Sequence, residues 1–189
     1  KDVFMTSRPL KRVSFHTVRG SGVDTAYFQL EPLPSSHPKF LFGMACRMVE
    51  IKGVLELITA VTQLQDEGLP IKLLLAGDVD HGNPGSLSRI HLAELCAREG
   101  IEWRGYVDNI KGFWSECHVA VLPSHGGEGV PMALLMAAAM GRPLISSDTN
   151  GNRDLVIDGE NGYLCKPRDV NSLKTAIKAC LSSDLTKLG

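Results

Sequence analysis

The chain has 189 residues, of which 43% are hydrophobic, and its formal net charge is −1. This length predicts one domain with enough apolar material for a packed core, and no apolar run approaches the ~20 residues that a membrane span needs. The near-neutral charge excludes a global field that would draw the chain to nucleic acid or to an anionic membrane, so we expect a small ligand, or a partner bound by a local patch.

Residues 1–38 differ in pattern from the rest of the chain. VSFHTV (13–18) is compatible with one strand, and it is followed by the flexible RGSGVD (19–24) and by EPLPSSHP (31–38). The Gly, Pro and Ser content of these segments is typical of a linker. We expect residues 1–38 to be the end of a preceding domain plus an interdomain linker, and residues 39–189 to form a compact domain.

From residue 39 onward, short apolar runs alternate with segments of helical period. The apolar runs predict strands at 39–45, 71–77, 101–106, 118–124, 142–147 and 162–167. Apolar residues at three-to-four spacing predict helices at 54–65, 87–98, 111–116, 132–140, 152–157 and 171–181. This alternation indicates βαβ units, so the predicted fold is α/β, a Rossmann-like doubly wound parallel sheet of about six strands.

Ligands of an open parallel sheet bind outside the carboxyl ends of its strands, so the segment after each strand is a candidate site. After the first predicted strand, Arg47 and Lys52 precede a helix that begins near Gly53. A planar guanidinium and a mobile ammonium group suit the oxygens of a diphosphate. The alternative is a pair of solvated surface cations, with Glu50 as a local partner.

A glycine-rich loop follows the fourth predicted strand. Gly126, Gly127 and Gly129 let a ligand approach the main chain, and Pro131 suits the first turn of the next helix. The unpaired N–H groups at that helix start favour a phosphate. The helix is apolar nearly all round, which predicts that it is buried.

Two side chains of the same loop are candidates for the site. Glu128 can accept hydrogen bonds from sugar hydroxyls, although a carboxylate before a helix can equally stabilise its N-terminus. His125 is a candidate lining residue.

Other polar residues give weaker signals. After the fifth predicted strand, Arg153 and Asp154 can reach the site or form a surface pair, and we expect Asp78 and Asp80 to be solvated acids. The five cysteines are widely spaced and no Cys/His cluster has metal-ligand spacing. This spacing predicts no metal site and a cytoplasmic protein with reduced thiols, several of them buried.

Three segments taken together resemble the C-terminal half of glycosyltransferase family 4, the retaining GT-B enzymes. They are FGMACRMVEIKG (42–53), PSHGGEGVPMALLMAAAMGRPLISSD (123–148) and NGNRDLVIDGENGYLCKPRDV (150–170). The resemblance implies the donor-binding domain of a two-domain enzyme that transfers a sugar from a nucleoside diphosphate to a glycan or lipid-linked acceptor. The short EGVP is similar to members that build bacterial surface polysaccharides.

The resemblance also implies roles for single residues. Arg47 and Lys52 would contact the donor diphosphate, and Glu128 would match the first, catalytic Glu of the family's E-x7-E motif. The backbone of Tyr106 and Val107 would lie near the nucleobase. The donor-binding loop would contain His125, Gly127, Gly129, Val130 and Pro131. Such enzymes need no metal ion, because basic side chains and a helix N-terminus stabilise the departing diphosphate.

Two departures from the family pattern matter. Met136 stands where the second Glu of the motif is expected to bind the ribose, and a thioether is only a weak acceptor. Three explanations stay open: a divergent active enzyme, a weakened relative, or a ribose held by other groups. The acceptor domain, through which any membrane contact is expected, is absent from this chain, so we expect no sugar transfer by the chain alone.

Two other classes of protein were weighed against a transferase. Met136 is compatible with a degenerate, non-catalytic module that binds a nucleotide sugar. A dinucleotide-dependent dehydrogenase would need GxGxxG directly after the first strand, where this chain has MACRMVEIKG.

Overall fold

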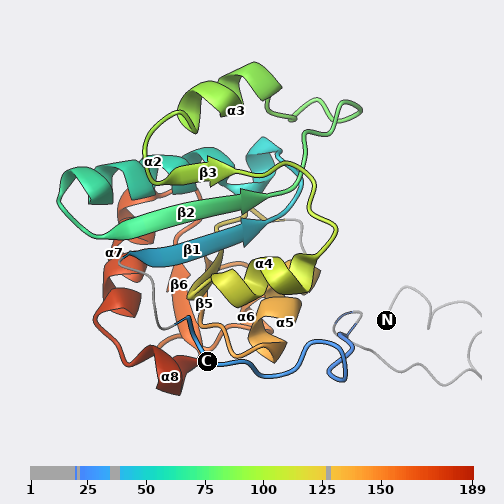
Figure 1. Ribbon diagram of the computed structural model, residues 1–189, viewed down its shortest axis with the longest axis vertical. Helices are drawn as coiled ribbons and strands as arrows, with labels where there is room; N and C mark the ends of the chain where they lie inside the picture. The colour runs from blue at the N-terminus through green and yellow to red at the C-terminus, as the bar shows by residue number, and fades with distance from the viewer. Residues whose placement is uncertain (1–19, 21, 35–38, 127–128) are drawn as a thin grey trace, which may run out of the picture.

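Six parallel strands form one sheet in the order β3-β2-β1-β4-β5-β6 (Figure 1). The computed structural model describes residues 20, 22–34, 39–126 and 129–189. The strands are β1 (Phe40–Ala45), β2 (Ile71–Ala76), β3 (Ile101–Trp103), β4 (Val119–Leu122), β5 (Leu144–Ser147) and β6 (Gly162–Cys165). All six predicted strands and the α/β class are therefore confirmed, whereas the predicted strand at 13–18 and the residues Gly127 and Glu128 lie outside the described residues.

Helices connect the strands, as the alternating pattern predicts. They are η2 (Glu50–Lys52, one 3-10 turn), α2 (Val54–Asp66), α3 (Arg89–Leu95), α4 (Ile110–Glu116), α5 (Met132–Ala139), α6 (Asn150–Arg153), α7 (Val170–Leu181) and α8 (Leu185–Leu188). The short η2 and α8 were not predicted, because three or four residues carry no readable helical period.

The predicted helix at 152–157 is wrong in position, because α6 ends at Arg153. The side chain of Asn161 explains this ending. Its Oδ1 accepts a hydrogen bond from the Ile157 N–H at 2.8 Å, and its Nδ2 donates to the Leu155 carbonyl at 2.9 Å. A side chain that binds backbone groups in this way competes with the helical pattern, so residues 154–157 are not helical.

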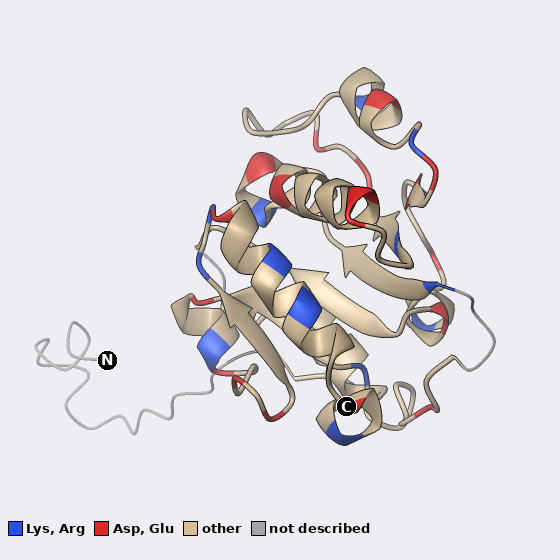
Figure 2. Ribbon diagram, turned by 90° about the vertical axis from the view of Figure 1, so that its left-hand side faces the viewer, with Lys and Arg blue, Asp and Glu red and all other residues tan. Residues whose placement is uncertain are grey.

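The two faces of the sheet are covered by different helices. On one face α2 packs against α7 and β2, and on the other α4 and α5 pack against β1, β4 and β5. Figure 2 shows the α2–α7 layer, with acidic residues on α2 and basic residues on α7. Lys174 and Lys178 of α7 each form an ion pair with Glu67, directly after α2, at 2.7 and 2.6 Å.

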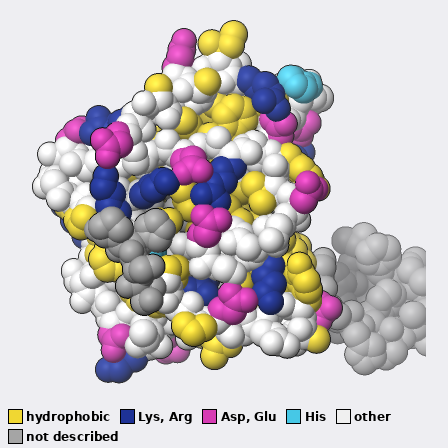
Figure 3. Space-filling model, viewed as in Figure 1, with side chains coloured by type: hydrophobic (Ala, Val, Ile, Leu, Met, Phe, Trp, Pro, Cys, Tyr) yellow, Lys and Arg dark blue, Asp and Glu magenta, His cyan; other side chains and the backbone are white. Residues whose placement is uncertain are grey.

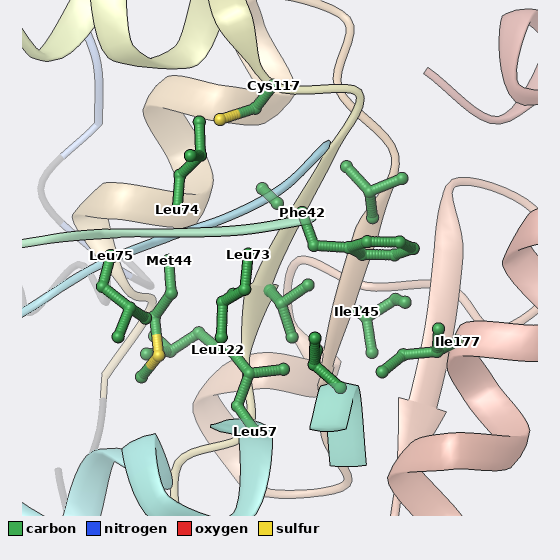
Figure 4. Packing of buried hydrophobic residues seen from close by; sticks show 14 of the residues in the cluster. Phe42, Met44, Leu57, Leu73, Leu74, Leu75, Cys117, Leu122, Ile145 and Ile177 are labelled. Carbon is green, nitrogen blue, oxygen red and sulfur yellow. The ribbon is translucent and has the colours of Figure 1, made fainter. Parts of the chain in front are cut away.

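The core lies on both faces of the central strands. Leu74 of β2 points toward Cys117, which follows α4, whereas Leu73 and Leu75 point to the other face, toward Leu57 of α2 (Figure 4). These three leucines of β2 are buried, as are Leu57 and Cys117. Strands buried on both faces are near-continuously apolar, which is why these runs were readable in the sequence.

The predicted burial of the helix after the glycine-rich loop is only half right. Leu134, Ala137 and Met140 are buried, but Met132 is exposed and Met136 is half-buried. A helix that covers a sheet buries one stripe of its surface, so the remaining apolar residues of α5 stay partly open.

Residues 22–34, predicted to belong to a linker, lie against α4 and α5. Phe28 is buried, and Glu31 accepts a hydrogen bond from Ser115 at 2.6 Å and pairs with Lys111 at 3.3 Å. Arg142, at the end of the α5–β5 turn, is buried and donates to the carbonyls of residues 31 and 32 at 3.0 and 3.1 Å. The segment is thus docked on the domain, and its role as a link to a preceding domain stays a prediction.

Candidate nucleotide site

The strand order reverses direction between β1 and β4, and the loops after these two strands meet there. The His125 N–H donates to the Ile51 carbonyl at 2.8 Å. Gly53 begins α2 with φ 77°, and a Cβ on it would lie 2.1 Å from the Pro123 carbonyl oxygen. Only glycine permits this approach, so the two loops that were read as phosphate-binding are held together at the switch point of the sheet.

The loop after β1 is fixed by the loop after β2. The Met48 N–H donates to the backbone carbonyl of Asp78 at 2.9 Å, and the Glu50 N–H donates to the carbonyl of Gly85 at 2.8 Å. Val49 forms an antiparallel β-bridge with Ser86. Met48 and Val49 are buried, whereas Arg47 is exposed. The buried residues anchor the loop and leave the guanidinium of Arg47 at the surface.

Arg47 forms an ion pair with Asp80, Nη1 to Oδ2 at 2.5 Å. The expectation that Glu50 is its local partner is therefore wrong, and so is the expectation that Asp78 and Asp80 are merely solvated, because Asp78 pairs with Arg89. The Arg47 side chain is 63% exposed, so this pair contributes about 0–1 kcal/mol. Separating Arg47 from Asp80 therefore costs little free energy.

A cavity of about 380 Å³ lies beside Arg47 at the carboxyl ends of β1, β2 and β3. Five segments line it: the loops after the three strands, the start of α4, and α5. Its walls are formed by Ala45, Cys46, Arg47, Ala76, Gly77, Asp78, Tyr106, Val107, Asp108, Ile110 and Met136. The cavity thus brings together four predicted site residues from distant parts of the chain, namely Arg47, Tyr106, Val107 and Met136.

The floor of this cavity depends on Gly77, which has φ 129°. A Cβ on Gly77 would lie 1.7 Å from the Cys46 carbonyl oxygen, so the loops after β1 and β2 touch through their backbones. The Gly77 carbonyl accepts a hydrogen bond from Trp103 Nε1 at 2.8 Å, and its N–H donates to Gly105 at 2.6 Å. These bonds fix three strand ends around one space.

His125 lies in a different place from Arg47. Its side chain is only 9% exposed, its Nδ1 accepts from Arg168 Nε at 3.2 Å, and its Nε2 lies 2.8 Å from Glu56 Oε1 without hydrogen-bonding geometry. With Glu56 and Arg168 it lines a second cavity, of about 580 Å³. The structure therefore places His125 in this second cavity rather than in the cavity beside Arg47.

The remaining loop residues are partly described. Gly129 is exposed, Val130 is half-buried and Pro131 is buried directly before α5. Lys52, the last residue of η2, is half-buried and lies next to the glycine that starts α2. Gly127 and Glu128, and with them the predicted catalytic role, lie outside the described part of the chain.

After β5, the polar residues bind one another. Arg153 forms an ion pair with Asp148, and the buried Asn152 donates to the Ser147 carbonyl at 2.9 Å. Among the described residues, no group of three or more His, Cys, Asp or Glu side chains could hold a metal ion.

Several residues that line the cavity beside Arg47 were not predicted from the sequence, among them Asp78, Asp108 and Ile110. Asp78 was read only as a solvated acid, and Asp108 and Ile110 were not considered. Asp108 follows Tyr106 and Val107 in the loop after β3, and Ile110 begins α4 directly after that loop, so the rule that strand ends carry ligands could have found them.

Comparison with known proteins assigns the chain to a family. The family model of the group 1 glycosyl transferases matches residues 39–183, and the chain belongs to this family. It is 26% identical over 145 residues to the capsular polysaccharide biosynthesis glycosyltransferase CapM of Staphylococcus aureus, covering 77% of this chain and 37% of CapM. It is 26% identical over 174 residues to the putative colanic acid biosynthesis glycosyltransferase WcaL of Escherichia coli, covering 88% and 42%.

Solved structures share the fold. Anabaena Alr3699/HepE, in complex with UDP and glucose, superimposes with a TM-score of 0.75 at 20% identity, over 91% of this chain and 49% of HepE. Sucrose-phosphate synthase from Thermosynechococcus elongatus gives 0.75 at 24% identity, over 90% and 44%. The chain therefore spans less than half the length of these relatives. No helix within the described ranges is long and apolar enough to cross a membrane.

Proposed function

We propose that this chain is the donor-binding half of a retaining glycosyltransferase of family 4. It binds a nucleoside-diphosphate sugar, whose sugar is transferred to a glycan or lipid-linked acceptor in the synthesis of a surface polysaccharide. The observation that carries this proposal is the cavity at the carboxyl ends of β1, β2 and β3, which combines apolar walls with the exposed guanidinium of Arg47. Its volume of about 380 Å³ is within the usual range of ligand sites.

The parts of a nucleotide match the parts of this cavity. Ala45, Ala76 and Val107 offer an apolar slot for a flat base, and the exposed ring of Tyr106 lies at the same wall. Once separated from Asp80, the planar guanidinium of Arg47 can donate two parallel hydrogen bonds to phosphate oxygens. Lys52 and the unpaired N–H groups at the start of α5 complete the proposed diphosphate site.

The proposed chemistry is stabilisation of the leaving group. As the bond between sugar and phosphate breaks, negative charge grows on the nucleoside diphosphate. Arg47, Lys52 and the α5 N-terminus would stabilise that charge in the transition state, and in this proposal they take the part that a metal ion plays in other transferases. Glu128 is proposed to act at the donor sugar.

The comparisons support the ligand class and the process. HepE was crystallised with UDP and with UDP-glucose, and CapM and WcaL are glycosyltransferases of capsular polysaccharide and colanic acid synthesis. The acceptor would be held by a second domain that this chain does not contain. Any membrane contact would be made by that domain.

A second candidate is a non-catalytic module that binds a nucleotide sugar. Met136 favours it, because this side chain lines the cavity beside Arg47 where a carboxylate would bind a hydroxyl group more strongly.

Calorimetric titration of the purified chain with UDP, GDP, ADP and their sugar conjugates tests the proposal. One nucleotide is expected to bind, and Arg47→Ala and Lys52→Ala should each weaken it by about 10- to 100-fold, the value of a charge-assisted hydrogen bond. Arg98→Ala is the matched control, since Arg98 is also an exposed arginine paired with an aspartate but lies near the amino ends of the strands.

Two results would contradict the proposal. Either no nucleotide binds the folded chain, or Arg98→Ala weakens binding as much as Arg47→Ala. If a nucleotide binds weakly and Met136→Glu raises its affinity, the site is a donor site of reduced affinity. This result favours the non-catalytic module.

A further inference from the structure

The cavity beside Arg47 contains a carboxylate that the fold itself does not use. Asp108 lines the cavity and is exposed, in the loop between β3 and α4. Among the described residues it makes no hydrogen bond or ion pair. The other acids of this region are engaged: Asp78 pairs with Arg89 and also accepts from the Val79 N–H at 2.7 Å, and Asp80 pairs with Arg47.

Asp108 does not cap the helix that follows it, because another residue does so. An aspartate just before a helix commonly accepts a hydrogen bond from the first turn. Here the neighbouring Asn109 does this, because its Oδ1 accepts from the Gly112 N–H at 2.9 Å. The carboxylate of Asp108 is therefore available to a ligand without loss of the cap.

The rest of the cavity offers little to a hydroxyl group. Val107, Ile110 and Met136 are apolar, and a methionine thioether is a weak acceptor. An ionised carboxylate accepts through two oxygens and forms the stronger, charge-assisted type of hydrogen bond. In a bound nucleotide the ribose lies between the base, which suits the apolar slot, and the phosphates, which suit Arg47.

We propose that Asp108 is a specificity-determining residue that accepts hydrogen bonds from the 2′- and 3′-hydroxyls of the donor ribose. The ligand class is thereby narrowed to ribonucleoside diphosphates. This inference rests on the proposed function, since it assumes that the cavity beside Arg47 holds the nucleotide.

Deoxynucleotides test the inference directly. Calorimetry would compare UDP, GDP and ADP with their 2′-deoxy and 3′-deoxy counterparts, on the native chain and on Asp108→Ala. The native chain should prefer the ribonucleotide by about tenfold, the value of one charge-assisted hydrogen bond at an exposed site. Asp108→Ala should remove most of this preference and leave the affinity for the deoxynucleotide within about twofold of the native value.

Two further variants sharpen the test. Asp66→Ala is the matched control, because Asp66 is an exposed aspartate at the end of α2, outside this cavity, and it should keep the full ribose preference. Met136→Glu in the Asp108→Ala background should restore the preference, since it returns a carboxylate to the same cavity.

The possible failures are distinguishable. If no nucleotide binds, the proposed function fails and this inference fails with it. A second outcome is that nucleotides bind but the native chain does not prefer the ribose form, or that Asp108→Ala weakens the binding of ribo- and deoxynucleotides equally. In that case Asp108 does not bind the ribose hydroxyls, and the proposed donor site is still supported.

Discussion

At the scale of single residues, the five thiols differ in burial. Burial raises the pKa of Cys117 and Cys180 to about 12 and that of Cys165 to about 11. Cys46 and Cys96 are half-buried, and Cys46 lines the cavity beside Arg47. Burial also raises the pKa of Cys96, so the prediction that Cys46 and Cys96 react in the folded protein rests on their greater accessibility.

Treatment with iodoacetamide at pH 8 should therefore modify Cys46 and Cys96 and spare the other three, as counted by mass spectrometry. Bound nucleotide should slow the modification of Cys46 and leave that of Cys96 unchanged. Rapid modification of Cys117 without denaturant would contradict the packing described above.

Gly43 in the middle of β1 is a second residue with a specific steric role. A Cβ at this position would lie 2.4 Å from Cys117 Sγ and 3.0 Å from the Trp114 ring. Gly43→Ala should therefore lower the free energy of unfolding by about 1–3 kcal/mol through overpacking, measured by urea denaturation.

The double variant Gly43→Ala/Cys117→Ala is the control for this contact. Removal of the sulfur makes room for the new methyl group, so the double variant should lose less stability than the sum of the singles, by at least about 0.5 kcal/mol. Additive losses would mean that the cost of Gly43→Ala arises elsewhere.

At the scale of elements, residues 22–34 depend on one buried cation. Two of the donors of Arg142 reach the carbonyls of Glu31 and Pro32, and the Glu31 N–H donates to Met140 at 3.3 Å. A Cβ on Gly141 would lie 2.4 Å from Leu30 Cδ1, so the segment also packs closely on this turn. The segment and the α5–β5 turn therefore form one unit, although about 110 residues separate them in sequence.

Arg142→Ala should lower the free energy of unfolding by about 2–3 kcal/mol, because two hydrogen bonds from a charged donor are lost. Hydrogen exchange should become faster at the Phe28 and Glu31 amides before the sheet opens. Arg98→Ala, an exposed arginine, should cost less than about 0.5 kcal/mol. If Arg142→Ala lowers the stability but the Phe28 and Glu31 amides stay fully protected from hydrogen exchange, Arg142 stabilises only the α5–β5 turn and does not hold residues 22–34.

At the scale of the whole molecule, charge is distributed as mixed pairs. Figure 3 shows Lys and Arg side chains next to Asp and Glu side chains on one face. Arg104 binds both carboxylate oxygens of Glu116 at 2.8 Å, and it also contacts Glu102 at 2.7 Å. Hydrogen bonds from Arg104 lower the pKa of Glu116, and those from Lys72 and then Arg104 lower the pKa of Glu102, both from the usual 4.5.

A carboxyl group whose pKa is lowered in the folded state stabilises the protein at any pH above its pKa in the unfolded chain. This stabilisation is lost as the pH falls through the pKa of the group in the folded state. The free energy of unfolding should therefore be nearly constant between about pH 7 and 5 and decline below about pH 4.5. Glu116→Gln should cost about 0.5–1 kcal/mol at pH 7, because the pair is partly exposed, and nothing once both acids are protonated. Urea titrations of both proteins across this pH range provide the measurement. A difference in free energy of unfolding that stays constant down to about pH 2.5 would contradict the prediction.

The size of the chain leads to a prediction about activity. The chain spans 49% of HepE, and a site that is completed by the closure of two domains cannot close within one of them. We expect the purified chain to bind a nucleotide and to transfer no sugar to any acceptor. Radiolabelled donor sugars offered with glycan and lipid-linked acceptors provide the assay, and turnover above the rate without protein would overturn the expectation.

The sequence by itself determined the six strands, the class of fold and the resemblance to glycosyltransferases. The strands were readable because parallel strands buried on both faces are apolar throughout, and the resemblance because the family's motifs stand in the expected order. Helical periodicity failed where a nearby side chain beyond the helix bound the backbone, as Asn161 does after the end of α6.

The tertiary structure alone decided which residues meet. Arg47 and its partner Asp80 are 33 positions apart, and Met136 reaches the same cavity as Cys46, so no spacing along the chain could predict these contacts. It also separated His125 from Arg47, because the side chain of His125 contacts Glu56 and Arg168 in another cavity. Periodicity reports what each segment buries, whereas the composition of a site depends on how the strand ends come together in space.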